Sequence, residues 1–174
     1  MPIDIICVAG TSLEDRAITA VESAQTLPES PLPLASHVAL IFTDADGDMH
    51  GIESVPPAVR DFPAGHYIGV NARHYPLICT PSQEHVIQGA AVAALGRPYG
   101  WESLVAALLY VAEGHPETFL ADPHARLDCS ALVATCLAAA GIDVQPGVPP
   151  DAVTPAAVEA FCVTQHQTPA PLTK

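Results

Sequence analysis

With 174 residues, a formal net charge of −13 and only six Lys and Arg, this chain has no basic patch that could face a polyanion. Nucleic-acid backbones and anionic membrane surfaces are bound by basic side chains that release counterions, so both classes of partner are excluded. Hydrophobic residues make up 49% of the chain, yet no apolar run reaches the roughly 18 residues of a membrane span. These properties predict a single domain over residues 1–165, followed by a frayed tail at 166–174.

The N-terminal residues and the cysteines indicate the compartment. Residues 1–8 carry an acidic residue and no basic one ahead of a short apolar run, which is unlike a signal peptide. We therefore expect the protein in the cytoplasm, or exported by a route that needs no cleaved signal. The five cysteines form no C-x-x-C pair and no zinc spacing. Four lie in apolar segments and are expected to be reduced core residues: Cys7, Cys79, Cys136 and Cys162.

The first half of the chain predicts a small, mostly antiparallel sheet. Short apolar or alternating segments bounded by turn residues indicate strands at 3–8, 36–43, 49–55, 66–70 and 75–79. A turn at 44–47 joins the second and third of these strands into a hairpin. Prolines at three of nine positions predict a surface loop at 27–35.

Helices are predicted from capping residues that precede apolar stripes. Thr80, with Pro81 at the first helical position and Gln83 at the third, begins a helix that runs to about residue 95. Further helices are expected at 12–22, 102–113, 129–140 and 155–163.

The helix that begins at Cys129 is the most informative of these. Asp128 can cap it, Gly141 suits its left-handed end, and Ala, Leu and Val surround it, so we expect a central, buried helix. Cys129 stands at the first position, where unpaired backbone N–H groups and the helix dipole stabilise a thiolate. A thiolate is the form of cysteine that attacks a carbonyl carbon. The alternative is a cysteine that merely fills the core.

A cysteine nucleophile needs a base, and His37 is the best placed of the eight histidines because it stands in an apolar strand. The alternative is a histidine that is hydrogen-bonded at the sheet surface. Those in loops or the tail are expected to be solvated: His115, His124 and His166. The rest show no spacing typical of metal ligands, so no metal site is predicted: His50, His66, His74 and His85.

Two residues of the neighbouring strand compete to orient His37. Side chains alternate along a strand, so Glu53 and His50 cannot both lie on the face of His37. The sequence alone does not fix the register. A three-residue loop at 45–47, in which Gly47 takes the left-handed position, favours Glu53. A carboxylate is also the stronger partner for an imidazolium.

Four motifs together resemble a known family. "AVAALGRPY" at 91–99 and "DCSALVATCLAAAGI" at 128–142 resemble the NlpC-type papain-like peptidases, and the strand "SHVALIF" at 36–42 with "GIESVPP" at 51–57 is similar to the histidine strand and the Glu-Ser segment of YiiX-like members. Because the histidine strand precedes the cysteine helix, the order resembles the circularly permuted branch, which includes YiiX-like proteins and lecithin retinol acyltransferase relatives. The resemblance implies that Cys129 is the nucleophile, His37 the base and Glu53 the orienting residue. It also implies that Tyr99 is the turn tyrosine near the nucleophile, where the alternative is a plain core aromatic.

The fold implied is α+β and papain-like, with the Cys129 helix packed on a small, mostly antiparallel sheet. The activity implied is thiol-dependent hydrolysis of an amide, in a peptide, an isopeptide or a lipid amide or ester, through an acyl-enzyme on Cys129. The backbone N–H of Cys129 is a candidate oxyanion donor. No cofactor is implied, and the expected partner is a small peptide or acyl-amide substrate. The alternatives are an acyltransferase on the same fold and a catalytically silent binding or assembly module.

The sequence departs from the bacterial-wall peptidases at two points. These enzymes usually carry Trp-Gly-Gly after the turn and Asp-Cys-Ser-Gly at the nucleophile. Here Trp101 is followed by Glu102 and Ser103, and Ala131 replaces the glycine. The departures argue against peptidoglycan as the substrate, although not against the fold.

Overall fold

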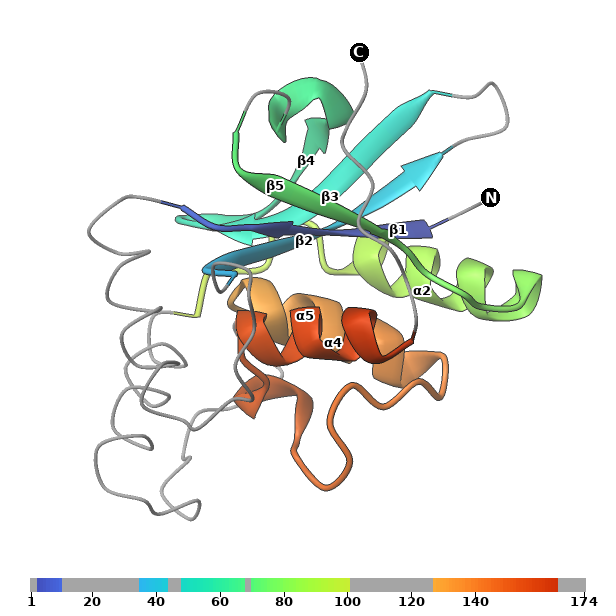
Figure 1. The fold of residues 1–174 in the computed structure, drawn as a ribbon. Helices are drawn as coiled ribbons and strands as arrows, with labels where there is room; N and C mark the ends of the chain where they lie inside the picture. The colour runs from blue at the N-terminus through green and yellow to red at the C-terminus, as the bar shows by residue number, and fades with distance from the viewer. Residues whose placement is uncertain (1–2, 11–34, 44–47, 68–69, 101–126, 166–174) are drawn as a thin grey trace.

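Five antiparallel strands form one sheet in the computed structural model, which describes residues 3–10, 35–43, 48–67, 70–100 and 127–165 (Figure 1). The strands lie in the order β4-β3-β2-β1-β5. Their bounds are Ile3–Val8 for β1, His37–Thr43 for β2, Met49–Val55 for β3, Ala58–Pro63 for β4 and Ala72–Pro76 for β5. The predicted strands at 3–8, 36–43 and 49–55 are confirmed, because each combines a regular apolar pattern with turn residues at its ends.

The other two strand predictions need correction. Residues 64–67 form the 3-10 helix η1 (Ala64–Tyr67) in place of the predicted strand at 66–70. The strand predicted at 75–79 lies earlier, because 72–76 pair with β1 and the chain then leaves the sheet toward the cap of the next helix. Strand β4 was missed, since its buried residues Val59 and Phe62 are separated by two exposed ones and do not alternate.

The α-helices of the described ranges cover one face of the sheet (Figure 1). They are α2 (Pro81–Ala93), α4 (Cys129–Ala139) and α5 (Pro155–Thr164), and a short 3-10 helix, η3 (Pro150–Ala152), precedes the last. The capping box predicted at Thr80 and Gln83 is present. None of the helices in the described part of the chain is long and apolar enough to cross a membrane. The helices predicted at 12–22 and 102–113, the turn at 44–47, most of the loop at 27–35 and the tail lie outside the described residues.

Helix α4 is the centre of the larger hydrophobic cluster, between the sheet and the helices α2 and α5. Eight of its eleven residues are buried, including Leu132, Val133 and Leu137, which are fully enclosed. Burial of a side chain of this size stabilises a fold by about 1.5–3 kcal/mol, so the position of α4 is strongly determined. The prediction of a buried, central helix is confirmed, and Cys136 is a core residue.

A smaller cluster lies on the opposite face of the sheet. It contains Ile6, Val8, Ala39, Ile41 and Phe62, and Tyr67 packs against it. The sheet is therefore buried on both faces, which explains why β1 has six buried residues in succession.

Candidate active site

Cys129 is the first residue of α4 and its side chain lies in the core, with 4% of the residue exposed. The preceding residue, Asp128, has an extended backbone, and its Oδ1 accepts the backbone N–H of Ala131 at 2.7 Å and the hydroxyl of Ser130 at 3.1 Å. These bonds satisfy donors of the first helical turn. The predicted N-cap is confirmed, and the sulfur stands at the positive end of the helix.

The segment that enters α4 is tied to two other elements. The hydroxyl of Ser54, which is fully buried, donates to the carbonyl of Leu127. Tyr99 forms a parallel bridge with Leu127, and the backbone N–H of Gly100 donates to the same carbonyl at 3.1 Å. Strand β3 and the turn at 97–100 therefore determine where Cys129 lies. Tyr99 is half-buried next to this segment, while its role toward a substrate stays a prediction.

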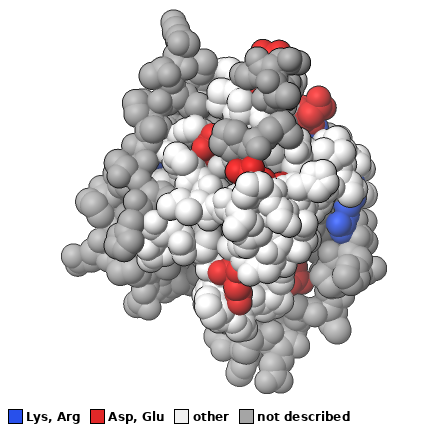
Figure 2. All heavy atoms as spheres, turned by 90° about the vertical axis from the view of Figure 1, so that its right-hand side faces the viewer, with Lys and Arg blue, Asp and Glu red and all other residues white. Residues whose placement is uncertain are grey.

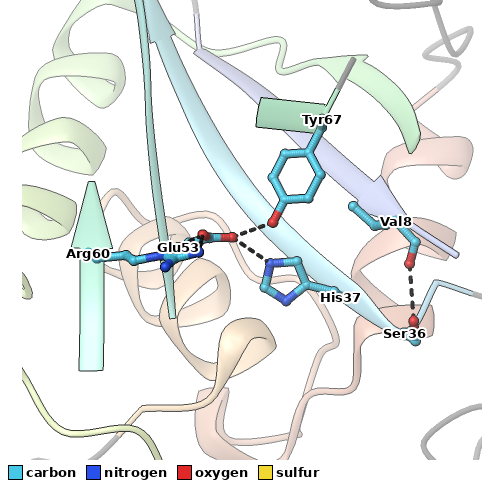
Figure 3. A network of polar contacts seen from close by, with 6 residues as sticks. All are labelled: Val8, Ser36, His37, Glu53, Arg60 and Tyr67. Atoms are coloured by element: carbon cyan, nitrogen blue, oxygen red, sulfur yellow. Dashed lines mark hydrogen bonds and ion pairs between the residues drawn. The ribbon is translucent and has the colours of Figure 1, made fainter. Parts of the chain in front are cut away.

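His37 and Glu53 share a face of the sheet, as the predicted register requires. Leu40 pairs with Ile52, so Glu53 stands opposite Ala39, two residues along the strand from His37. The Nε2 atom of His37 lies 2.9 Å from Oε2 of Glu53 (Figure 3). His50 pairs with Phe42 and therefore points to the other face. The prediction of a hydrogen bond between Glu53 and His37 is confirmed.

Counting donors on Glu53 fixes the tautomer of His37. Arg60 donates from Nε at 2.9 Å and from Nη2 at 2.8 Å to Oε1, and Tyr67 donates its hydroxyl to Oε2. An ionised carboxylate accepts hydrogen bonds and donates none, so Nε2 of His37 must carry the proton that it shares with Oε2. The other ring nitrogen, Nδ1, is then the atom left to exchange a proton with a nucleophile.

The electrostatics of His37 connect it to Cys129. Burial alone would lower the pKa of His37, but the charge of a Cys129 thiolate, a hydrogen bond to Cys129, and the bond to Glu53 outweigh it and raise that pKa to about 10. An imidazolium is therefore stable between the sulfur and the carboxylate. The structure brings together the three residues that the sequence proposed, and their catalytic roles stay predictions.

Glu53 is held in its charged form. Its side chain is 0% exposed, and burial would raise its pKa, but hydrogen bonds from His37 and Tyr67, the positive charge of His37 and the bond from Arg60 lower it to about 2. Burial of Tyr67, its hydrogen bond to Glu53 and the charge of that carboxylate raise the pKa of the phenol well above its ordinary value. The carboxylate is charged throughout the neutral range.

Two members of this cluster, Arg60 and Tyr67, were missed in the sequence. Arg60 belongs to β4, which had no regular pattern, and Tyr67 belongs to the segment that was predicted to be a strand. The pairing of Glu53 with Arg60 across β3 and β4 would have found the first of them, had the hairpin at Pro56 and Pro57 been recognised.

Comparisons with known proteins bear on the fold. No protein-family model matches the sequence, and no curated protein matches it. Among solved structures, the chain is similar to the crystal structure of metalloprotein yiiX from Escherichia coli O157:H7, DUF1105, with 17% sequence identity and a TM-score of 0.57. The match covers 83% of this chain and 68% of that one. The protein therefore has an α+β fold of the YiiX-like, papain-like type.

The description as a metalloprotein applies to the neighbour from Escherichia coli O157:H7. In the ranges of this chain that the structure describes, no group of three or more His, Cys, Asp or Glu is arranged to hold a metal ion. The Nε2 atom of His74 on β5 lies 3.1 Å from Oδ2 of Asp4 on the neighbouring strand β1.

Proposed function

We propose that this protein is a thiol-dependent hydrolase that cleaves an amide through an acyl-enzyme on Cys129. The observation that supports the proposal most is the position of His37. Its Nε2 lies against a buried carboxylate, and the interaction of the ring with Cys129, at the start of a buried helix, raises the pKa of His37. A histidine with a purely structural role does not need both a cysteine and a carboxylate as partners. Nucleophilic catalysis by cysteine does, because the nucleophile contacts the base and the base contacts the group that orients it.

The proposed reaction has two steps. The Cys129 thiolate attacks the amide carbon, a carbon–sulfur bond forms, and the carbonyl electron pair moves to the oxygen. The backbone N–H of Cys129, at the helix start, is the candidate donor to that oxyanion. His37 gives its Nδ1 proton to the leaving nitrogen as the carbon–nitrogen bond breaks.

Water then attacks the thioester that remains. His37 accepts one proton from the water, the carbon–sulfur bond breaks, and the acid product leaves with the ion pair restored. Glu53 keeps its charge in both steps and supports the imidazolium. The departures at Ala131 and Glu102 are reasons to test peptides, isopeptides and fatty-acyl amides alongside wall peptides.

Trapping the acyl-enzyme tests the proposal. The folded protein is incubated with p-nitrophenyl acetate and with a panel of peptidyl, isopeptidyl and fatty-acyl anilides, quenched in acid, and digested for mass spectrometry. We expect one hydroxylamine-sensitive acyl group on Cys129, and a Cys129→Ser variant that folds but turns over at least about a thousand-fold more slowly. Cys79→Ser, which changes a half-buried thiol outside the site, is the control and should keep the activity. Acylation at another cysteine, or full turnover by Cys129→Ser, would reject the proposal.

A further inference from the structure

Tyr67 meets the same carboxylate oxygen as His37. Its hydroxyl donates to Oε2 of Glu53, and the centroids of the Tyr67 and His37 rings lie 6.0 Å apart with an angle of 36° between the planes. Figure 3 shows the two side chains approaching that oxygen from different sides. The phenol has one proton, and the bond to Glu53 uses it, so Tyr67 has none left to give to a substrate.

Arg60 meets the opposite oxygen. It stands directly across from Glu53 in the register of β3 and β4, and two of its N–H groups point to Oε1 (Figure 3). The Arg60 side chain is 52% exposed whereas that of Glu53 is 0% exposed. The guanidinium therefore covers the carboxylate from the solvent side, and Tyr67 covers it from the side of η1.

The Tyr67 ring is itself fixed by two aromatic neighbours. The Phe62 ring meets the Tyr67 ring edge-on, with the centroids 5.3 Å apart and an angle of 89° between the planes. The His66 ring also meets it edge-on, with the centroids 4.9 Å apart and an angle of 85°. Phe62 lies over Gly51, its partner in the register of β3 and β4, so closely that a Cβ at position 51 would overlap the ring. The absence of a side chain at Gly51 thus allows the stack that supports Tyr67.

We propose that Tyr67 and Arg60 are positioning residues, which hold the carboxylate of Glu53 so that Oε2 faces Nε2 of His37. The inference rests on the proposed thiol chemistry, because its purpose is to align the base of that reaction. A glutamate side chain has three rotatable bonds, and a single bond to His37 would leave its other oxygen without a partner in a buried place. Donors on both oxygens remove that freedom and stabilise the charged form.

Tyr67→Phe tests the inference because it removes the hydroxyl and keeps the ring. Two quantities are measured: the titration of the Glu53 carboxyl carbon by NMR, assigned through its absence in Glu53→Gln, and the rate of Cys129 alkylation by iodoacetamide against pH. A hydrogen bond to a charged group corresponds to about tenfold in an equilibrium constant. We therefore expect the Glu53 titration to move up by about one pH unit. Alkylation at mildly acidic pH should slow by up to about tenfold, because a displaced carboxylate supports the imidazolium less well, with no change above the His37 pKa of about 10, where the thiol ionises without an imidazolium.

Matched variants separate positioning from a general loss of packing. Tyr75→Phe loses the same kind of bond, from a buried tyrosine to Glu159 at 2.9 Å, and should leave both measurements unchanged. Arg60→Gln should move the Glu53 titration upward, and Arg60→Lys, which keeps the charge, should restore part of the shift.

Three outcomes decide between the claims. Wild-type profiles in both Tyr67→Phe and Arg60→Gln, or an equal effect of Tyr75→Phe, would overturn the positioning role. If Cys129 of the wild type were alkylated no faster than Cys79, the proposed function would fall. The Glu53 titration would then still decide whether Tyr67 and Arg60 hold the carboxylate.

Discussion

Glu53 accepts hydrogen bonds from three side chains, and its charge adds to that of Cys129 in raising the pKa of His37. The carboxylate is buried, so its attraction for the imidazolium is screened little by water. Its partner Arg60 reaches the solvent. On the face drawn in Figure 2, acidic side chains are visible in several places and basic ones in few.

Substituting Glu53→Gln should lower the pKa of His37 from about 10, because the negative charge that favours the imidazolium is lost. The new amide side chain would also place either its N–H₂ group or its uncharged oxygen next to the Arg60 guanidinium, which now donates to a charged oxygen. The measurement is an NMR titration of the His37 ring, with Glu84→Gln on α2 as the control for a change of one charge. An unchanged His37 titration would show that Glu53 does not support the imidazolium.

At the scale of one element, the half-buried Asp128 combines the cap of α4 with a titrating carboxyl. Desolvation raises the pKa of Asp128 to about 6, and bonds from Ala131 and Ser130 oppose the rise. A group whose pKa is raised by folding favours the folded state while protonated. The contribution of Asp128 to stability therefore falls as the pH rises from about 3.8, its ordinary value, to about 6.

Two variants separate the cap from the charge. Asp128→Asn keeps an N-cap acceptor and should abolish that part of the pH dependence, whereas Asp128→Ala should abolish it as well and be less stable than Asp128→Asn by about 1 kcal/mol at every pH through loss of the cap. The free energy of unfolding, measured in urea from pH 4 to 7, gives the comparison. Parallel curves for wild type and Asp128→Asn would contradict the assignment.

At the scale of the whole molecule, a second buried glutamate connects α5 to the sheet. Glu159 accepts hydrogen bonds from Arg73, from the Tyr75 hydroxyl at 2.9 Å and from the backbone N–H of Ala35 at 3.2 Å. Ala35 lies two residues before His37, so this contact also fixes where β2 begins. Next to it, the Ser36 hydroxyl accepts the N–H of Gly10 at 3.0 Å and contacts the Val8 carbonyl, a contact drawn in Figure 3. The last helix is thus tied to the sheet at the start of β2, where Arg73 also holds Glu159.

Local patterns account for the parts of the fold that were predicted. The apolar runs after Asp128 and after His37 are properties of short segments, and they gave the cysteine helix and the histidine strand. The shared face of His37 and Glu53 was favoured by the three-residue loop expected at 45–47 and by the family resemblance, not by the strands alone. The edge hairpin with Arg60 and the turn with Tyr67 follow from pairing and packing across the sheet, which no short pattern encodes. The approach of Cys129 to His37 came from family resemblance, since long-range contacts leave no local signal.

The alkylation order of the five cysteines tests the central claim most directly. Burial alone would make Cys79 the fastest, because it is half-buried whereas the other four are buried. Burial also raises the pKa of Cys136 to about 12. With limiting iodoacetamide at pH 6, read by peptide mass spectrometry, we predict that Cys129 is labelled first, and that His37→Ala removes this lead at pH 6. Labelling of Cys79 before Cys129 in the wild type, or an unchanged profile in His37→Ala, would contradict the account of Cys129 as a thiolate paired with His37.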